Sequence, residues 1–286
     1  MIKKYAYGLA NNKKINTIED YQQCELEMKW HYGLKSDYSS TNEVSLYDRV
    51  FDMSIISGVI NENDIENYFE KVKSNVFKTK NWYNSDVKYF VPDLSRYIVP
   101  SFEQKSDFIL TGNNPSVVGP VSFLKHSEGM ESGLFNIFLE NLFKIYRNLL
   151  DQIHFKSVHI DEPCFSLEDF NDSEIECILS FYDKLSKTIT PKINIFTYGK
   201  ITSWFKNLNV NGIGVNILCD DNFEKIVNGA LSPSITLFAG VINEEKFSRK
   251  EYDKIIELEK IFGDVYISNS KPLCFHKDQY KVLNNF

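Results

Sequence analysis

Two adjacent acids, Asp161 and Glu162, follow a short apolar segment and are followed in turn by Pro163. Successive side chains of a β-strand point to opposite faces, so one acid can face a binding pocket while the other faces a neighbouring loop. A carboxylate in such a place can orient a cationic group of a substrate, and it can equally cap a turn and hold a loop. The chemistry therefore depends on the elements that position this pair.

Short segments rich in β-branched or aromatic residues recur along the chain, and each is closed by Gly, Pro, Asp or Asn, which is typical of strands. The predicted strands are residues 4–8, 87–91, 117–123, 157–160, 193–198, 212–218, 235–239 and 265–268. Helical patterns lie between most of them, and the clearest covers residues 134–149. Mostly apolar strands such as 193–196 are typical of a parallel sheet that helices cover.

About eight β/α units in 286 residues predict an α/β fold with a TIM-type (β/α)8 barrel. A doubly wound open sheet is the alternative, because a count of strands does not show whether the sheet closes. The long segment between the first two predicted strands carries amphipathic spacing and predicts a helical insertion at about 17–80. Neither an internal repeat nor a Pro/Gly/Ser-rich linker divides the sequence, so we expect one domain over residues 1–286.

In a TIM-type barrel the reacting groups lie at the C-terminal ends of the strands. Polar residues near predicted strand ends are therefore the candidate substrate-binding residues: Asp86, Lys88, Ser122, Asp161, Glu162, Tyr198 and Asn216. In this interpretation the two acids orient an amino group and Lys88 attracts a carboxylate. His126 falls in a predicted loop, where we expect it at the surface.

The composition excludes several classes of protein. With 39 acidic and 32 basic side chains the net charge is −7, which argues against a broad nucleic-acid interface. The sequence contains neither a segment long and apolar enough to span a membrane nor a signal-peptide pattern at its start. Five cysteines without a regular framework are typical of free thiols. We expect a cytoplasmic protein that binds a small molecule and contacts neither nucleic acid nor membrane.

Several segments together resemble one known family. The run from His159 to Pro163, which contains Ile160-Asp161-Glu162-Pro163, looks like the Ile-Asp-Glu-Pro strand end of cobalamin-independent methionine synthase. Residues 82–94 and 118–124 resemble, in the same order, segments of that family's N-terminal barrel. The family has two fused TIM-type barrels. The resemblance spans most of this chain and implies a barrel of the N-terminal type.

The family moves a methyl group from 5-methyltetrahydrofolate to homocysteine, whose thiolate a zinc ion stabilises. Its zinc ligands, a His-x-Cys pair, a Glu and a later Cys, belong to the C-terminal barrel. No His-x-Cys pair occurs in this sequence, so that site has no counterpart here. A relocated zinc site would draw on Cys164, Cys219, Cys274 and His276, which follow predicted strand ends. The alternative is that these cysteines are scattered free thiols.

The resemblance also implies a contact with the polyglutamate tail of a folate. The family's N-terminal barrel opens with Gly-Phe-Pro-Arg-Ile-Gly followed by basic residues, whereas residues 7–14 here lack the Arg. Lys13 and Lys14 are the remaining candidates for this contact, and the alternative is that both are solvated.

Three functions agree with these observations. The chain is a methyltransferase that moves a methyl group from a folate-type donor to homocysteine or another thiol, with zinc as the one candidate cofactor. Alternatively, it is a non-catalytic barrel that partners a separate, zinc-bearing chain of the C-terminal type. In the third case it is a diverged barrel with another substrate, which the residues at Asp86 and Lys88 would favour, since the family has Asn and His there.

Overall fold

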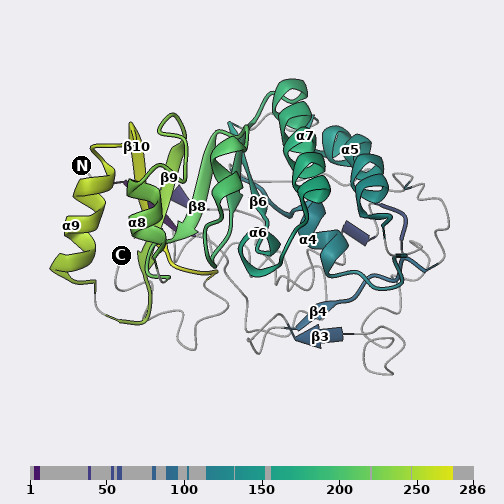
Figure 1. The fold of residues 1–286 in the computed structure, drawn as a ribbon, viewed down its shortest axis with the longest axis horizontal. Coiled ribbons are helices and arrows are strands. Elements are labelled where there is room, and N and C mark those ends of the chain that lie inside the picture. Colours follow the sequence, from purple (N-terminus) through teal and green to yellow (C-terminus); the bar gives the residue numbers. More distant parts are fainter. Residues whose placement is uncertain are drawn as a thin grey trace, which may run out of the picture.

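The computed structural model describes residues 3–6, 38–39, 53–54, 57–59, 79–81, 88–95, 102, 114–131, 133–151, 156–219, 221–245 and 247–272. Its main element is an eight-stranded sheet (Figure 1). The strands are β1 (Lys3–Ala6), β2 (Tyr38–Ser39), β5 (Ser116–Val118), β6 (Ser157–Asp161), β7 (Lys192–Phe196), β8 (Gly212–Asn216), β9 (Thr236–Ile242) and β10 (Asp264–Asn269).

The sheet has the strand order of a barrel. It runs β2-β1-β10-β9-β8-β7-β6-β5, and every neighbouring pair is parallel. From β5 onward each strand pairs with the next along the chain, while β1 pairs with the last strand, β10. In a doubly wound sheet β1 would instead lie in the interior of the sheet, and the order of the strands would run in opposite senses on its two sides. The predicted TIM-type architecture is therefore confirmed over the described residues.

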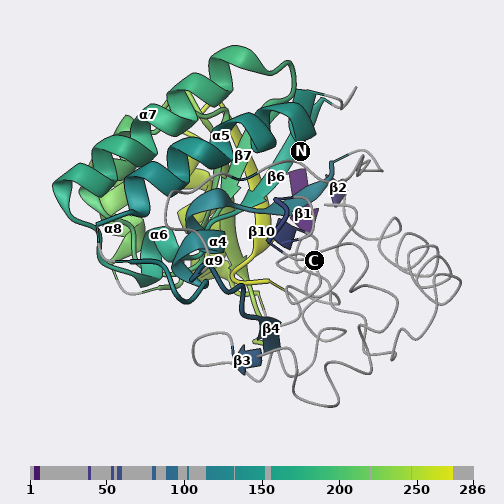
Figure 2. The ribbon, with the colours of Figure 1, turned by 90° about the vertical axis from the view of Figure 1, so that its right-hand side faces the viewer.

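Helices cover one side of this curved sheet, as Figure 2 shows for α5, α7 and α8. The helices are α4 (Pro120–Lys125), α5 (Phe135–Asp151), α6 (Cys164–Leu167), α7 (Asp172–Thr188), α8 (Asn222–Val227), α9 (Arg249–Leu258) and the 3₁₀ turn η2 (Ser203–Asn207). The apolar positions of α5 recur every three or four residues and are buried. Capping boxes start α7 at Asn171 and α9 at Ser248. No helix among the described residues is long and apolar enough to cross a membrane.

Three details differ from the sequence predictions. The strand predicted at 117–123 ends at Val118, because Pro120 begins α4 and a proline suits the first helical turn. The strand predicted at 87–91 is β4 (Lys88–Phe90), which pairs antiparallel with β3 (Thr79–Asn81) outside the barrel sheet. The second barrel strand is β2, which lies within the insertion expected to be helical at 17–80. Of that insertion, Met53 and Ser54 are helical.

The two faces of the sheet carry different side chains. On β6, Val158 and Ile160 pack in the core that includes the buried residues of α5 and α7. The rings of Tyr5, Phe196 and Phe238 form a separate cluster on the inner face. Room for these rings comes from glycines of β8, since a β-carbon on Gly214 would overlap the ring of Phe196. The inner face is therefore packed with aromatic rings.

Candidate functional site

The inner face of the barrel holds a hydrogen-bonded chain of three polar side chains. Oδ1 of Asp161, the last residue of β6, lies 2.8 Å from Nε2 of His159. Nδ1 of His159 lies 3.1 Å from the hydroxyl oxygen of Tyr5 on β1. The imidazole also stacks on the ring of Phe196, with centroids 3.7 Å apart and planes 8° apart. Asp161, His159 and Tyr5 are all buried, so the strand-end carboxylate is held in place through His159.

The second acid of the pair, Glu162, holds the start of α4. Its Oε1 accepts hydrogen bonds from the backbone N–H of Val121 (3.0 Å) and from the hydroxyl of Tyr182 (2.6 Å). Its Oε2 accepts from the backbone N–H of Ser122 (2.7 Å) and from that residue's hydroxyl (2.6 Å). The N-cap residue of α4 is Gly119, which has no side chain to satisfy these amides. Glu162 therefore caps the helix from another part of the chain.

The protonation of Glu162 is set by two opposing effects. Burial raises its pKa from 4.5 to about 7, because the charged form loses its hydration, while the four donors favour the ionised form. Burial and the neighbouring carboxylate also raise the pKa of the Tyr182 hydroxyl well above 10. Both carboxylate oxygens of Glu162 are thus occupied by donors within the protein. The structure brings Ser122 and Glu162 together, and their contact with a substrate stays a prediction.

Backbone bonds fix the strand ends around this acid. The N–H of Gly119 donates to the carbonyl of Asp161 (2.7 Å), and the N–H of Glu162 donates to the carbonyl of Phe196 (2.9 Å). The hydroxyl of Tyr146 on α5 donates to the carbonyl of Val118 (2.7 Å). The ends of β5, β6 and β7 are therefore locked to each other and to the helical layer.

Tyr198 and Asn216 also lie close together. The side-chain amide of Asn216 donates to the carbonyl of Tyr198 at 3.4 Å. The sequence analysis missed Asn222, which is fully buried and donates to the carbonyls of Asn216 and Gly199, each at 2.8 Å. Its Oδ1 accepts from the N–H of Ile201 at 2.8 Å. Asn222 therefore ties together the segments that follow β7 and β8, and its place shortly after β8 was the only sequence signal for that role.

Cys164 contacts an imidazole. Its Sγ lies 3.6 Å from Nε2 of His126, and the ring of Tyr89 packs against the same imidazole at 5.0 Å between centroids. The prediction that His126 lies at the surface was wrong, because the residue is only 8% exposed. Burial lowers the pKa of His126 to about 3, so the imidazole is neutral near pH 7. The pair is a thiol next to a neutral imidazole.

The described residues do not fit a relocated zinc site. Among them, no group of three or more His, Cys, Asp or Glu side chains lies close enough to hold a metal ion. Cys164 is packed in the core beside His126, while Cys219 follows β8 and is partly exposed. Cys274 and His276 lie outside the described residues. We therefore derive no chemical step through a metal in this chain.

Other predicted residues also lie outside the described part of the chain. These are Asp86, Lys13 and Lys14. Lys88 begins β4, where its backbone pairs with Asn81, so it belongs to the hairpin and not to a barrel strand.

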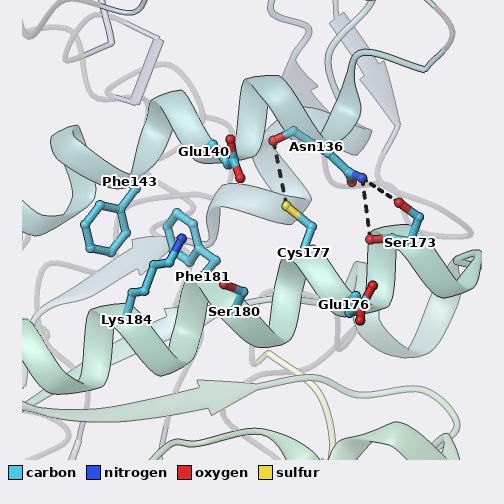
Figure 3. Close-up of a pocket in the computed structure, with 9 residues that line it drawn as sticks. All are labelled: Asn136, Glu140, Phe143, Ser173, Glu176, Cys177, Ser180, Phe181 and Lys184. Atoms are coloured by element: carbon cyan, nitrogen blue, oxygen red, sulfur yellow. Dashed lines mark hydrogen bonds between the residues drawn. The ribbon is translucent and has the colours of Figure 1, made fainter.

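A groove of about 640 Å³ lies between α5 and α7 (Figure 3). Phe143 and Phe181 line one part of it, and Glu140, Glu176 and Lys184 place charges around it. The thiol of Cys177 donates to the carbonyl of Asn136 at 3.7 Å within this groove. The groove belongs to the helical layer and contains no residue from a strand end. It is therefore separate from the Asp161 site.

The chain can now be compared with known families. The model of a family described as "Cobalamin-independent synthase, N-terminal domain" matches residues 11–263. The chain belongs to the cobalamin-independent methionine synthase family. This confirms the resemblance inferred from the 159–163 strand end and the accompanying segments.

The family relatives are considerably longer than this chain. One is the 5-methyltetrahydropteroyltriglutamate–homocysteine methyltransferase of Thermodesulfovibrio yellowstonii, which is 25% identical over 83% of this chain and 36% of its own length. The enzyme of the same name from Lactococcus lactis subsp. cremoris (strain SK11) is 27% identical over 80% of this chain and 34% of its own length. The chain thus spans about a third of these methionine synthase relatives.

One solved structure shares the fold of this chain. It is a methyltransferase from Methanosarcina mazei, which superposes with a TM-score of 0.54 at 11% identity and covers 93% of this chain and 83% of its own. At this identity the likeness shows the fold alone, and it agrees with the barrel order of the strands.

Proposed function

We propose that this chain is the N-terminal-type barrel of a two-part cobalamin-independent methionine synthase, and that a separate zinc-bearing barrel activates the thiol. The observation that carries the proposal is the match of residues 11–263 to the model of the family's N-terminal domain. The use of Glu162, which accepts four hydrogen bonds from within the chain and builds the fold, agrees with a non-catalytic role for that acid.

The two barrels together would act on the substrates for which the relatives are named, a folate-type methyl donor and homocysteine. In this proposal Asp161, at the end of β6, contributes to a small-molecule site, with Tyr198 and Asn216 on neighbouring strand ends. Lys13 and Lys14 would contact the polyglutamate tail, and Asp86 and Lys88 complete the predicted set. We place the complex in the cytoplasm.

The test compares the purified, tag-free chain alone with the chain mixed with a zinc-bearing barrel of the C-terminal type from the same host. Methyl transfer from 5-methyltetrahydropteroyltriglutamate to homocysteine is measured, and complex formation is followed by light scattering. We expect turnover and a defined complex only when both chains are present. Turnover by this chain alone, or no complex at any concentration tested, would contradict the proposal.

A second function, methyl transfer by this chain alone, is supported by the thiol–imidazole contact between Cys164 and His126 near the end of β6. Elemental analysis of the purified chain separates the two functions. Near one zinc per chain, lost in a Cys164→Ser variant, would support methyl transfer by this chain alone. A metal content far below one zinc per chain would support the two-part enzyme.

A further inference from the structure

The helices α5 and α7 lie side by side in the helical layer and run in the same direction (Figures 1 and 2). In the first turn of each helix, the side-chain amide of Asn136 on α5 donates to the hydroxyl of Ser173 on α7 at 2.8 Å. About two turns further along both helices, Phe143 packs edge-on against Phe181, with ring centroids 5.6 Å apart. The two phenyl rings therefore mark the same level on both helices.

The charge of the outer surface reverses at this level on both helices. On α7 the exposed Glu176 precedes the phenyl rings and the exposed Lys184 follows them, as Figure 3 shows. On α5 the exposed Glu140 precedes the rings and the exposed Arg147 follows them. The midpoint of each acid–base pair falls at the level of the rings. The surface is therefore acidic toward the N-terminal ends of both helices and basic toward their C-terminal ends.

These four charged side chains surround a partly apolar surface. Within the described part of the chain none of the four forms an ion pair, whereas Asp183 in the basic half is already paired with Lys187 at 2.6 Å. The groove of about 640 Å³ with the two phenyl rings in its wall lies between the charges. Ile137, which is 45% exposed, lies one turn from Glu140 on α5. An exposed apolar surface among charges that have no partner is typical of a protein interface.

The symmetry of the charges selects the partner. A two-fold axis that lies in the plane of this surface and crosses both helices at the phenyl rings would lay each helix antiparallel on its own copy. Glu176 of one chain then meets Lys184 of the other, and Glu140 meets Arg147. An axis parallel to the helices would instead bring Glu140 near Glu176, and like charges repel. The surface is therefore complementary to itself in the first arrangement, as a two-fold interface requires.

We propose that a second copy of this chain docks on the α5–α7 surface, around a two-fold axis at the level of Phe143 and Phe181. Glu176 pairs with Lys184 of the other copy and Glu140 with its Arg147, and the symmetry makes each pair twice. The interface belongs to the helical layer and contains no residue from a strand end. The dimer thus leaves the strand ends uncovered, and the inference does not depend on the proposed function.

Exchanged charges test this arrangement. Lys184→Glu and Glu176→Lys each set like charges opposite each other in a dimer of the variant, whereas a dimer with one chain of each variant restores both ion pairs between the α7 helices. Both positions are exposed, so we expect both variants to melt like the parent. Lys250→Glu is the matched control, since this exposed lysine lies on α9 at the other end of the helical layer (Figure 1).

Sedimentation equilibrium measures the masses. We expect dimers of the parent and of Lys250→Glu, dimerisation at least about a hundredfold weaker in each exchanged variant alone, and recovery to within about tenfold of the parent in their equimolar mixture. A monomeric parent, an exchanged variant that dimerises like the parent, or a mixture that stays monomeric would each overturn the proposal.

These masses involve this chain alone, so a failure here is distinct from a failure of the proposed function. The parent and Lys184→Glu are also mixed with the zinc-bearing barrel of the C-terminal type. We expect the same result for both. A complex that forms with the parent and is lost in Lys184→Glu would assign the α5–α7 surface to that barrel and overturn the docking of a second copy.

Discussion

Glu162 and Gly119 lie so close together that a β-carbon on Gly119 would overlap the carboxyl group of Glu162. The acid cannot turn away, because four hydrogen bonds fix its two oxygens. The absence of a side chain at Gly119 is therefore what lets the acid that follows β6 reach the amides of α4.

Replacing Gly119 with alanine tests this relationship. The new methyl group must displace the carboxylate or the start of α4, and we expect a loss of about 3 kcal/mol in the free energy of unfolding, at the upper end for an overpacked site. Urea unfolding measures it. Gly263→Ala is the matched control, since a β-carbon at Gly263 meets no atom within 4 Å. If both variants unfold at the same urea concentration, the contact does not constrain the fold.

The stability of the protein should depend on pH through Glu162. Its pKa of about 7 in the folded chain lies above the ordinary value of 4.5, so the folded state holds a proton that the unfolded chain releases. The stabilisation is complete below about pH 4.5 and is lost as the pH rises through about 7, and this span corresponds to about 3 kcal/mol.

The measurement is urea unfolding at intervals from pH 5 to pH 8 in the parent and in Glu162→Gln. The difference between the two removes the contribution of all other titrating groups. We expect the free energy of unfolding of the parent to fall relative to that of Glu162→Gln as the pH rises toward 8. A difference that stays constant over this range would show that Glu162 keeps one charge state throughout.

Tyr182 provides a third prediction. Its hydroxyl donates to Oε1 of Glu162 at 2.6 Å, and both groups are fully buried. Tyr182→Phe removes this donor, which should cost about 2 kcal/mol of stability and move the pKa of Glu162 further above about 7. Unfolding at pH 8 measures the cost. Tyr252→Phe, at a residue 43% exposed, is the control and should unfold like the parent.

Asp161→Asn addresses the ligand site. The substitution keeps the size of the side chain and removes its charge, so the affinity for L-homocysteine should fall at least about tenfold while the melting temperature stays within a few degrees. Calorimetry and thermal unfolding check the two parts. Asp264→Asn, at an exposed acid paired with Lys3 on the barrel, is the control for a lost charge. A variant that melts far below the parent would make Asp161 a structural residue.

The strands from β6 to β10 could be predicted from the sequence because their outward residues, such as Val158 and Ile160, form apolar patterns closed by turn residues. The boundary of β5 was predicted too far along the chain, since Val121 and Phe123 are as apolar as strand residues and only Pro120 marks the helix. The two-residue strand β2 is too short to leave a pattern.

The candidate site could be predicted only in part. The acid pair was visible, and the two-residue spacing of His159 and Asp161 was the available signal that both share one face. The partners of these residues were not visible. Tyr5 is 154 residues from His159, and Tyr182 is 20 residues from Glu162, so only the curved parallel sheet and the packed helices bring them together. The role of Glu162 in stabilising the fold is therefore visible only from the tertiary contacts.

The pairing of β1 with β10 has a consequence for how the barrel forms. Lys3 and Asp264 contact each other although 261 residues separate them. The strand that carries Tyr5 cannot pair with β10 until residues 264–269 have been synthesised. Closing so long a loop costs entropy before any contact is gained, and contacts of this sequence separation slow folding. The contact of Tyr5 with His159 depends on a strand pairing of high sequence separation, which we expect to form late in folding.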